Sequence, residues 1–112
     1  MIVTHITIVP LPGKREAILE ILRHVESTLK GRAGCEECAV SQQSGGEGAI
    51  LYMDRWLSSQ ELGRHIQSSL FLRVLLAMEL AARAPQVEFL EIAGTEGLPW
   101  VEALRARTGW DG

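Results

Sequence analysis

The chain has 112 residues, of which 46% are hydrophobic, and its formal net charge is −3. This length suits one domain with a modest core, and the hydrophobic content is typical of a globular chain rather than a disordered one. The slight acidity and the lack of a basic stripe argue against nucleic acid or an anionic membrane surface as the main partner.

The first residues, MIVTHITIVPLPG, contain neither a basic leader nor a cleavage site and are typical of a strand. No apolar run reaches the roughly 18 residues that a membrane-spanning helix needs. The most hydrophobic stretch, Leu70–Ala82, is interrupted by Arg73 and Glu79. We therefore expect a cytoplasmic protein that does not enter the membrane.

The amino-terminal part predicts a strand followed by a helix. β-Branched residues dominate Ile2–Val9, and their alternation places His5 on the face opposite Thr4. The next segment, Lys14–Lys30, has the spacing of an amphipathic helix, with an apolar stripe made of Ile18, Ile21, Leu22, Val25 and Leu29.

The two cysteines of the chain, Cys35 and Cys38, form a CxxC motif at the start of a second predicted strand, Cys35–Gln43. On a regular strand their odd spacing directs them to opposite faces, where they could share neither a disulfide nor a metal ion. We therefore expect ordinary reduced cysteines. A metal site that spans a dimer and a redox pair remain the alternatives.

A glycine-rich connection leads to the third predicted strand, Ala49–Trp56, which has Tyr52, Asp54 and Trp56 on one face. Ser58 and Glu61 then have the spacing of a capping box. They predict a helix that carries Leu62, His65 and Ile66 on one side.

A second break at Gln67-Ser68-Ser69 predicts a new cap and a third helix, Leu70–Arg83, which Pro85 would end. This helix is apolar nearly all round, which is typical of a subunit interface or a cavity wall. Val87–Ala93 is predicted as the fourth strand. Pro99–Arg107 is predicted as a terminal helix whose apolar residues Trp100, Val101 and Leu104 pack down, with Trp110 available to a partner.

The resulting order, β-α-β-β-α(α)-β-α, predicts an α+β fold of the ferredoxin-like type, an antiparallel sheet with its helices on one face. We assign residues 1–94 to this domain and 95–112 to a carboxy-terminal extension. The other sheet face, which carries His5 and Val9, would be bare. A second copy related by a two-fold axis could cover it, so we predict a homodimer that dimerises through its sheets.

Several motifs resemble the antibiotic biosynthesis monooxygenase domain. They are the Asp54-Arg55-Trp56 strand end with its serine cap and the histidine nine residues after Trp56. The strand-P-G-helix opening of Ile2–Leu22, the Gly34-Cys35 strand start and the VEFLEI strand agree with them. The resemblance runs from Met1 to about Gly94. It implies a dimeric α+β barrel of two ferredoxin-like subunits. Some members of that family oxidise phenols or quinols with O2 and no cofactor, some degrade haem, and others have no known activity.

This sequence departs from the family pattern at three places. Asp54 stands where relatives carry glutamate, and Leu70 stands where many carry a second histidine. The first strand, THITIV, lacks the basic or asparagine residues of active relatives.

An oxygenase without a cofactor needs an anionic, electron-rich substrate, a base, a dry pocket and donors for developing oxygen charge. His65 is the best base, and Trp56 offers an apolar wall with one N–H donor, so we predict both as catalytic residues. Contacts to a small hydrophobic or aromatic ligand are predicted for Tyr52, Asp54, His5, Leu70 and Phe71. No cofactor and no metal ion are expected.

Each of these residues also has a structural interpretation. Trp56 can be the core anchor of the second helix, His65 a core-edge histidine, and His5 a barrel-interface residue. Three functions therefore remain open: a cofactor-independent monooxygenase that oxidises a small quinol or phenol, a non-catalytic dimeric ligand-binding or stress-response module, and a haem-binding or haem-degrading protein with His65 as axial ligand.

Overall fold

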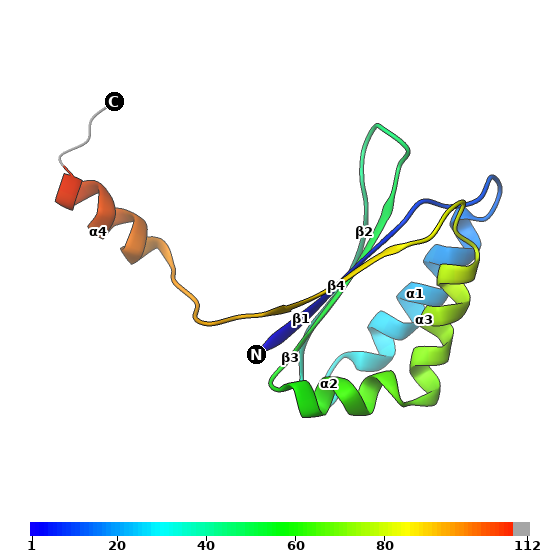
Figure 1. Cartoon of the computed structure of the whole chain (residues 1–112), viewed down its shortest axis with the longest axis horizontal. Coiled ribbons are helices and arrows are strands. Elements are labelled where there is room, and N and C mark those ends of the chain that lie inside the picture. Colours follow the sequence, from blue (N-terminus) through cyan, green and yellow to red (C-terminus); the bar gives the residue numbers. More distant parts are fainter. Residues whose placement is uncertain (109–112) are drawn as a thin grey trace.

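A computed structural model describes residues 1–108, which form one antiparallel sheet, three helices that cover one of its sides and a fourth helix that lies away from the body (Figure 1). The strands of the sheet lie in the order β2-β3-β1-β4. The elements in chain order are β1 (Ile2–Ile8), α1 (Arg15–Leu29), β2 (Cys35–Gln42), β3 (Ile50–Trp56), α2 (Ser59–Ile66), α3 (Ser69–Glu79), β4 (Gln86–Glu91) and α4 (Leu98–Thr108). The predicted ferredoxin-like α+β fold is confirmed.

The core lies between the sheet and helices α1 and α3. Strand β1 contributes Thr4, Ile6 and Ile8 to the helix side, as the alternation predicted. Helix α1 buries Ile18, Leu19, Leu22, Val25 and Leu29 against them. Ile21, predicted as core, is only partly buried, and Leu19 is buried instead, because α1 contacts α3 as well as the sheet.

Strand β2 contains an irregularity that changes the positions of the cysteines. Cys35 and Cys38 are paired with Trp56 and Asp54, so Glu36 is an additional residue that forms a β-bulge. Trp56 and Asp54 both face the helices, and the two cysteines, which are free thiols, do so too. The prediction of opposite faces was wrong, because the bulge converts an odd spacing into an even one.

Two serine caps fold the segment after β3 into two short helices. The Ser58 hydroxyl oxygen accepts a hydrogen bond from the Glu61 N–H at 3.2 Å, and α2 begins there. The Ser68 hydroxyl oxygen accepts a hydrogen bond from the Phe71 N–H in the same way, at the start of α3. Half of the predicted capping box is thus present, while the Glu61 carboxylate accepts from Arg64.

Helix α2 buries Leu62 and His65, but Ile66, predicted on the same face, is 39% exposed. The chain turns at Gln67, directly after Ile66, so this last residue of a two-turn helix does not reach the core.

Helix α3 ends four residues before the predicted boundary. Beyond Glu79 the chain pairs with the segment that follows β1: the Leu11 N–H donates to the Leu80 carbonyl at 2.9 Å, and the Ala82 N–H donates to the Val9 carbonyl at 2.7 Å. These long-range bonds replace the helical ones, so Pro85 does not set the end of the helix.

Helix α4 does not pack on the domain, in contrast to the prediction. It follows an extended segment, residues 92–97, and lies away from the body on the side of the sheet opposite α1 and α3 (Figure 1). Its residues Trp100, Val101 and Leu104 are exposed. Trp110, predicted to dock on a partner, lies outside the described residues. Over residues 1–108, no helix has the length and apolar character needed to cross a membrane.

Candidate active site

A group of three aromatic rings lies where β3, α2 and α3 meet. The Trp56 and His65 rings are stacked, with their centroids 4.9 Å apart and an interplanar angle of 27°. The Phe71 ring is nearly perpendicular to the His65 ring, at 88°, with the two centroids 5.3 Å apart. The exposed fractions of Trp56 and His65 are only 2% and 3%, so the imidazole is enclosed by aromatic carbon.

One buried carboxylate oxygen lies next to both the histidine and a tyrosine. The Tyr52 hydroxyl donates a hydrogen bond of 2.7 Å to Asp54 Oδ2. His65 Nε2 lies 3.6 Å from the same oxygen, a distance too long for a good hydrogen bond but short enough for electrostatic attraction. Asp54, which is fully buried, can therefore stabilise a positive charge on His65.

Several buried polar atoms around this carboxylate have no hydrogen-bond partner. They are Asp54 Oδ1, Trp56 Nε1, Thr4 Oγ1 and both ring nitrogens of His65. Thr4 lies directly opposite Asp54 in the β1–β3 ladder. A buried polar atom without a partner costs about 1–3 kcal/mol, and native proteins rarely leave several together. The cluster thus has donors and acceptors ready for the polar atoms of water or of a ligand.

The electrostatics give the histidine and the tyrosine different protonation states. Burial lowers the pKa of His65; Asp54 opposes this shift, and Arg32 adds to it. The imidazole is therefore neutral near pH 7 and can accept a proton. Burial, helped by the neighbouring Asp54 charge, raises the pKa of Tyr52, so its hydroxyl stays protonated and remains a donor.

The two cysteines border this cluster, which the sequence did not reveal. Burial raises the pKa of Cys38 to about 12 although its hydrogen bond with Tyr52 acts in the opposite direction, and burial also raises the pKa of Cys35. Both thiols therefore stay protonated and are weak nucleophiles. They line a concavity of about 250 Å³ at the end of α1.

Five of the seven predicted site residues come together here: Tyr52, Asp54, Trp56, His65 and Phe71. Leu70 is partly buried and packs against the hydrophobic core. His5 is on the wrong side of the sheet for this group, because its side chain points to the face without helices. The strand alternation predicted this face for His5, and its contact with a ligand stays a prediction. Whether the other residues bind substrate stays a prediction.

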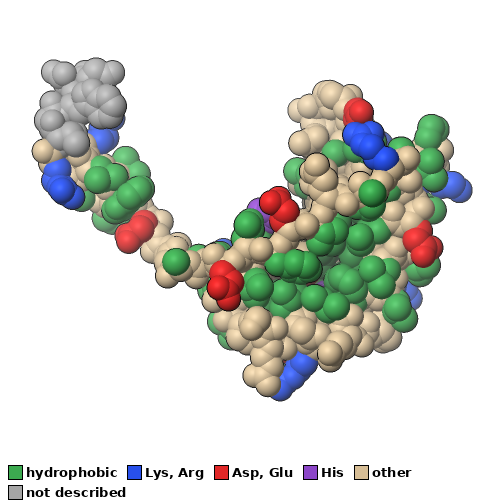
Figure 2. All heavy atoms as spheres, in the orientation of Figure 1, with side chains coloured by type: hydrophobic (Ala, Val, Ile, Leu, Met, Phe, Trp, Pro, Cys, Tyr) green, Lys and Arg blue, Asp and Glu red, His purple; other side chains and the backbone are tan. Residues whose placement is uncertain are grey.

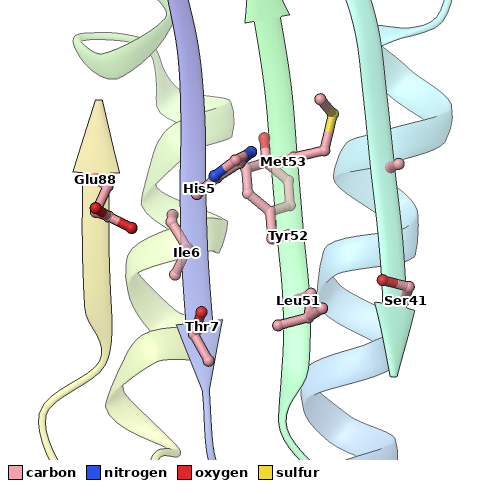
Figure 3. Close-up of a pocket in the computed structure, with 9 residues that line it drawn as sticks. His5, Ile6, Thr7, Ser41, Leu51, Tyr52, Met53 and Glu88 are labelled. Carbon is pink, nitrogen blue, oxygen red and sulfur yellow. The ribbon is translucent and has the colours of Figure 1, made fainter. Parts of the chain in front are cut away.

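His5 instead borders a concavity of about 260 Å³ on the bare sheet face (Figure 3). Met53 and Glu88 are its cross-strand neighbours, and Thr7 lies two residues along β1. Neither this concavity nor the one beside the cysteines is lined by Trp56 or His65. With these two side chains almost fully buried, a ligand can reach them only if side chains of the surrounding elements move.

Thr4, Cys38 and Arg32 are the site neighbours that sequence reasoning missed. The alternation did place Thr4 on the helix side, but nothing in the sequence paired it with Asp54. The bulge that turns Cys38 inward has no sequence signal comparable to a glycine or proline. Over residues 1–108, no group of three or more histidine, cysteine, aspartate or glutamate side chains could hold a metal ion together.

Comparison with known proteins places these residues in a known family. The family model described as antibiotic biosynthesis monooxygenase matches residues 1–75, which include the whole aromatic cluster. The sequence has no significant match among curated proteins.

Solved structures share the fold at low sequence identity. Rv0793 from Mycobacterium tuberculosis is 21% identical with a TM-score of 0.75, and the match covers 86% of this chain and 98% of that one. PA3566 from Pseudomonas aeruginosa is 22% identical with a TM-score of 0.71, covering 83% and 94%. A crystal structure named antibiotic biosynthesis monooxygenase is 14% identical with a TM-score of 0.73, covering 84% and 100%.

Proposed function

This chain belongs to the antibiotic biosynthesis monooxygenase family, and we propose that it is a cofactor-independent monooxygenase that oxidises a small phenol or quinol with O2. The observation that carries the proposal is the set of unpartnered polar atoms on Asp54, Trp56 and His65, enclosed by aromatic rings. A phenolic oxygen would supply the hydrogen bonds that these atoms lack, and the rings would exclude water.

In this proposal His65 is the general base. Its neutral imidazole takes the phenolic proton, and the imidazolium that forms is stabilised by Asp54 at 3.6 Å. Tyr52 holds the Asp54 carboxylate in place through its 2.7 Å hydrogen bond. The Trp56 N–H is the donor for the phenolate oxygen or for the reduced oxygen that develops next.

The reaction balances without an external reductant. The phenolate transfers electrons to O2, and a bond forms between one oxygen atom and a hydrogen-bearing ring carbon ortho or para to the phenolate oxygen; in a hydroquinone, whose para carbon carries a hydroxyl, this is an ortho carbon. Loss of the hydrogen on that carbon and cleavage of the O–O bond give a quinone. The second oxygen atom leaves as hydroxide and takes the proton held by His65, so the products are a quinone and water.

Oxygen uptake with a panel of phenols and hydroquinones tests the proposal. We expect uptake above the spontaneous rate, a loss of at least about 100-fold in His65→Ala, and a smaller loss in Trp56→Phe, which keeps an aromatic ring but removes the N–H donor. His24→Ala is the matched control, because His24 is an exposed histidine on α1. An unreactive wild-type protein, or a His65→Ala variant with full activity, would contradict the assignment.

A non-catalytic ligand-binding module is the second candidate, and one observation favours it. Trp56 and His65 are almost fully buried, and neither lines the concavities beside the cysteines or on the bare sheet face. A binding module predicts that phenols raise the melting temperature equally with and without O2. The monooxygenase predicts that the ligand is consumed once O2 is admitted.

The haem alternative stays a prediction. It requires that His65 be an axial ligand, so titration with hemin should produce a Soret band that His65→Ala abolishes. The same titration of His24→Ala, which keeps His65, should leave the band unchanged.

For the assembly, we propose a homodimer in which the bare sheet faces of two copies pack together. The face is left uncovered by the helices in Figure 1, and it presents Leu51 and Met53 beside His5. Removing such a face from water would stabilise the dimer by roughly 25 cal/mol for each Å² of apolar surface that becomes buried.

A further inference from the structure

Helix α4 carries an apolar stripe that its own domain does not cover. Trp100, Val101 and Leu104 are 52%, 45% and 36% exposed, and their spacing places them on one side of the helix. Glu102 projects from the opposite side by the same geometry. A contiguous exposed apolar stripe of this kind marks an interaction surface.

A second uncovered apolar surface lies on α3 and β4, and we call it the α3–β4 surface. It consists of exposed side chains on the outer side of α3 and on the helix side of the edge strand: Leu72 (59%), Leu75 (42%), Leu76 (54%), Val87 (40%) and Phe89 (49%). Figure 2 shows apolar side chains gathered over this part of the body.

The sheet register explains why part of this surface is open. Val87 and Phe89 pair with Ile6 and Thr4, whose side chains point to the helix layer, so they point the same way. Helices α1 and α3 nevertheless leave β4 exposed along its whole length. The helix layer therefore has space for one more helix beside α3 and over β4.

The direction of α4 indicates that this helix comes from another copy of the chain. Residues 92–97 carry α4 to the side of the sheet opposite α1 and α3 (Figure 1), whereas the α3–β4 surface of the same chain faces the helix side. Six residues span at most about 20 Å. An arm that leaves its own body in this way is placed to reach a second molecule on that side.

The charges at the two surfaces also match. The last turn of α4 contains the exposed Arg107. The α3–β4 surface has Glu79 at the end of α3 and Glu91 at the end of β4, both exposed and one at each end of the apolar strip. The basic last turn can meet only one of these two acidic ends at a time, so the charges favour one direction of α4 along the surface.

We propose that α4 of one copy docks on the α3–β4 surface of a second copy, so that two chains exchange their carboxy-terminal helices. Trp100 is the anchor of this contact, because a large aromatic residue that becomes buried contributes most to an interface. The exchange does not depend on the catalytic proposal, since none of its residues belongs to the aromatic cluster.

Photo-crosslinking with isotope mixing tests the exchange on the full chain. The photoreactive residue p-benzoylphenylalanine replaces Trp100, and chains labelled with ¹⁵N are mixed and equilibrated with unlabelled chains before irradiation. We expect crosslinked peptide pairs of mixed isotope that join α4 to residues 72–76 or 86–91. The same residue in place of Glu102, on the opposite side of α4, is the matched control and should crosslink poorly.

Three outcomes would overturn the proposal. If both peptides of every crosslinked pair carried the same isotope, α4 would fold back on its own chain. Mixed pairs that join α4 to the bare sheet face would mean that the docking surface is wrong. No crosslink at a concentration where the protein is a dimer would mean that α4 docks nowhere.

Charge variants provide a second, independent measurement. Trp100→Asp on the arm and Leu76→Asp on the α3–β4 surface should each raise the dissociation constant of the dimer at least tenfold in sedimentation equilibrium. The double variant should raise it by much less than the product of the two effects, because each change removes the same contact. Glu102→Gln should leave the constant unchanged. The exchange would be contradicted if the two substitutions acted additively on the free energy of dimer dissociation, or if neither changed the dissociation constant.

Discussion

His65 is the residue whose surroundings are most unusual in this molecule. It contacts the Trp56 and Phe71 rings, both of its nitrogens lack hydrogen-bond partners, and a buried carboxylate is 3.6 Å away. Burial lowers its pKa against the attraction of Asp54. A histidine of this kind is neutral in the folded protein, so near pH 7 its imidazole is in the form that can accept a proton from a substrate.

This shift predicts how stability depends on pH. The folded pKa of His65 is below the ordinary value of 6.5, so the unfolded chain binds a proton more readily than the folded chain. The free energy of unfolding should therefore be unaffected by His65 above pH 6.5 and should fall as the pH decreases through that value. Urea unfolding of the wild type and of His65→Gln at about pH 7.5 and about pH 5.5 checks this, because the variant lacks the titrating group. A wild-type protein that is relatively more stable at the lower pH than the variant would contradict the shift.

Two buried hydroxyls in the same cluster should respond in opposite ways to removal. Tyr52→Phe deletes the donor of the 2.7 Å hydrogen bond and leaves Asp54 short of a partner, so it should lower the free energy of unfolding by about 1–3 kcal/mol. Thr4→Val deletes a hydroxyl that bonds to nothing and should be neutral or stabilising without ligand. Chemical denaturation of the two variants measures both effects. Equal destabilisation would mean that the Thr4 hydroxyl has a partner.

At the scale of the elements, the turn from β3 into α2 and α3 positions His65 and Phe71. Ser58 and Ser68 each begin a short helix with a hydroxyl that accepts a backbone N–H. Two short helices bend round the end of the sheet where one long helix would run straight past it. The β-bulge at Glu36 has a comparable effect on β2, since it turns Cys38 toward the cluster.

The first cap provides a direct test of this arrangement. Ser58→Ala should destabilise the protein by about 0.5–2 kcal/mol, because the Glu61 N–H loses its acceptor. Ser59→Ala is the matched control: it is the exposed neighbour within the helix and should change stability by less than about 0.5 kcal/mol. Thermal or urea unfolding compares them. Equal effects of the two substitutions would show that the cap does not stabilise α2.

At the scale of the whole molecule, the sheet separates two environments. The helix side holds the aromatic cluster, and the bare side holds His5 with its concavity. The α3–β4 surface and the stripe on α4 add two further uncovered apolar areas. A chain of 112 residues with this much uncovered apolar surface is expected to bury it by association.

The sheet-to-sheet dimer can be tested separately from the helix exchange. Met53→Glu places a charge in the bare face and should weaken the dimer at least tenfold, because an unpaired carboxylate would be buried between the sheets. Gln60→Glu, an exposed change of the same charge on α2, is the control. Light scattering at micromolar concentration measures the assembly. A wild-type monomer under these conditions would contradict the dimer.

The sequence alone determined the order of elements, the faces of β1 and β3 and both serine caps. These features are local: alternation, helical spacing and cap residues act within a few neighbours in the chain. Only the tertiary structure decided the rest. The bulge at Glu36 and the early end of α3 depend on backbone pairing between distant segments. The exposure of Trp100 depends on where residues 92–97 leave the sheet, which no local pattern encodes.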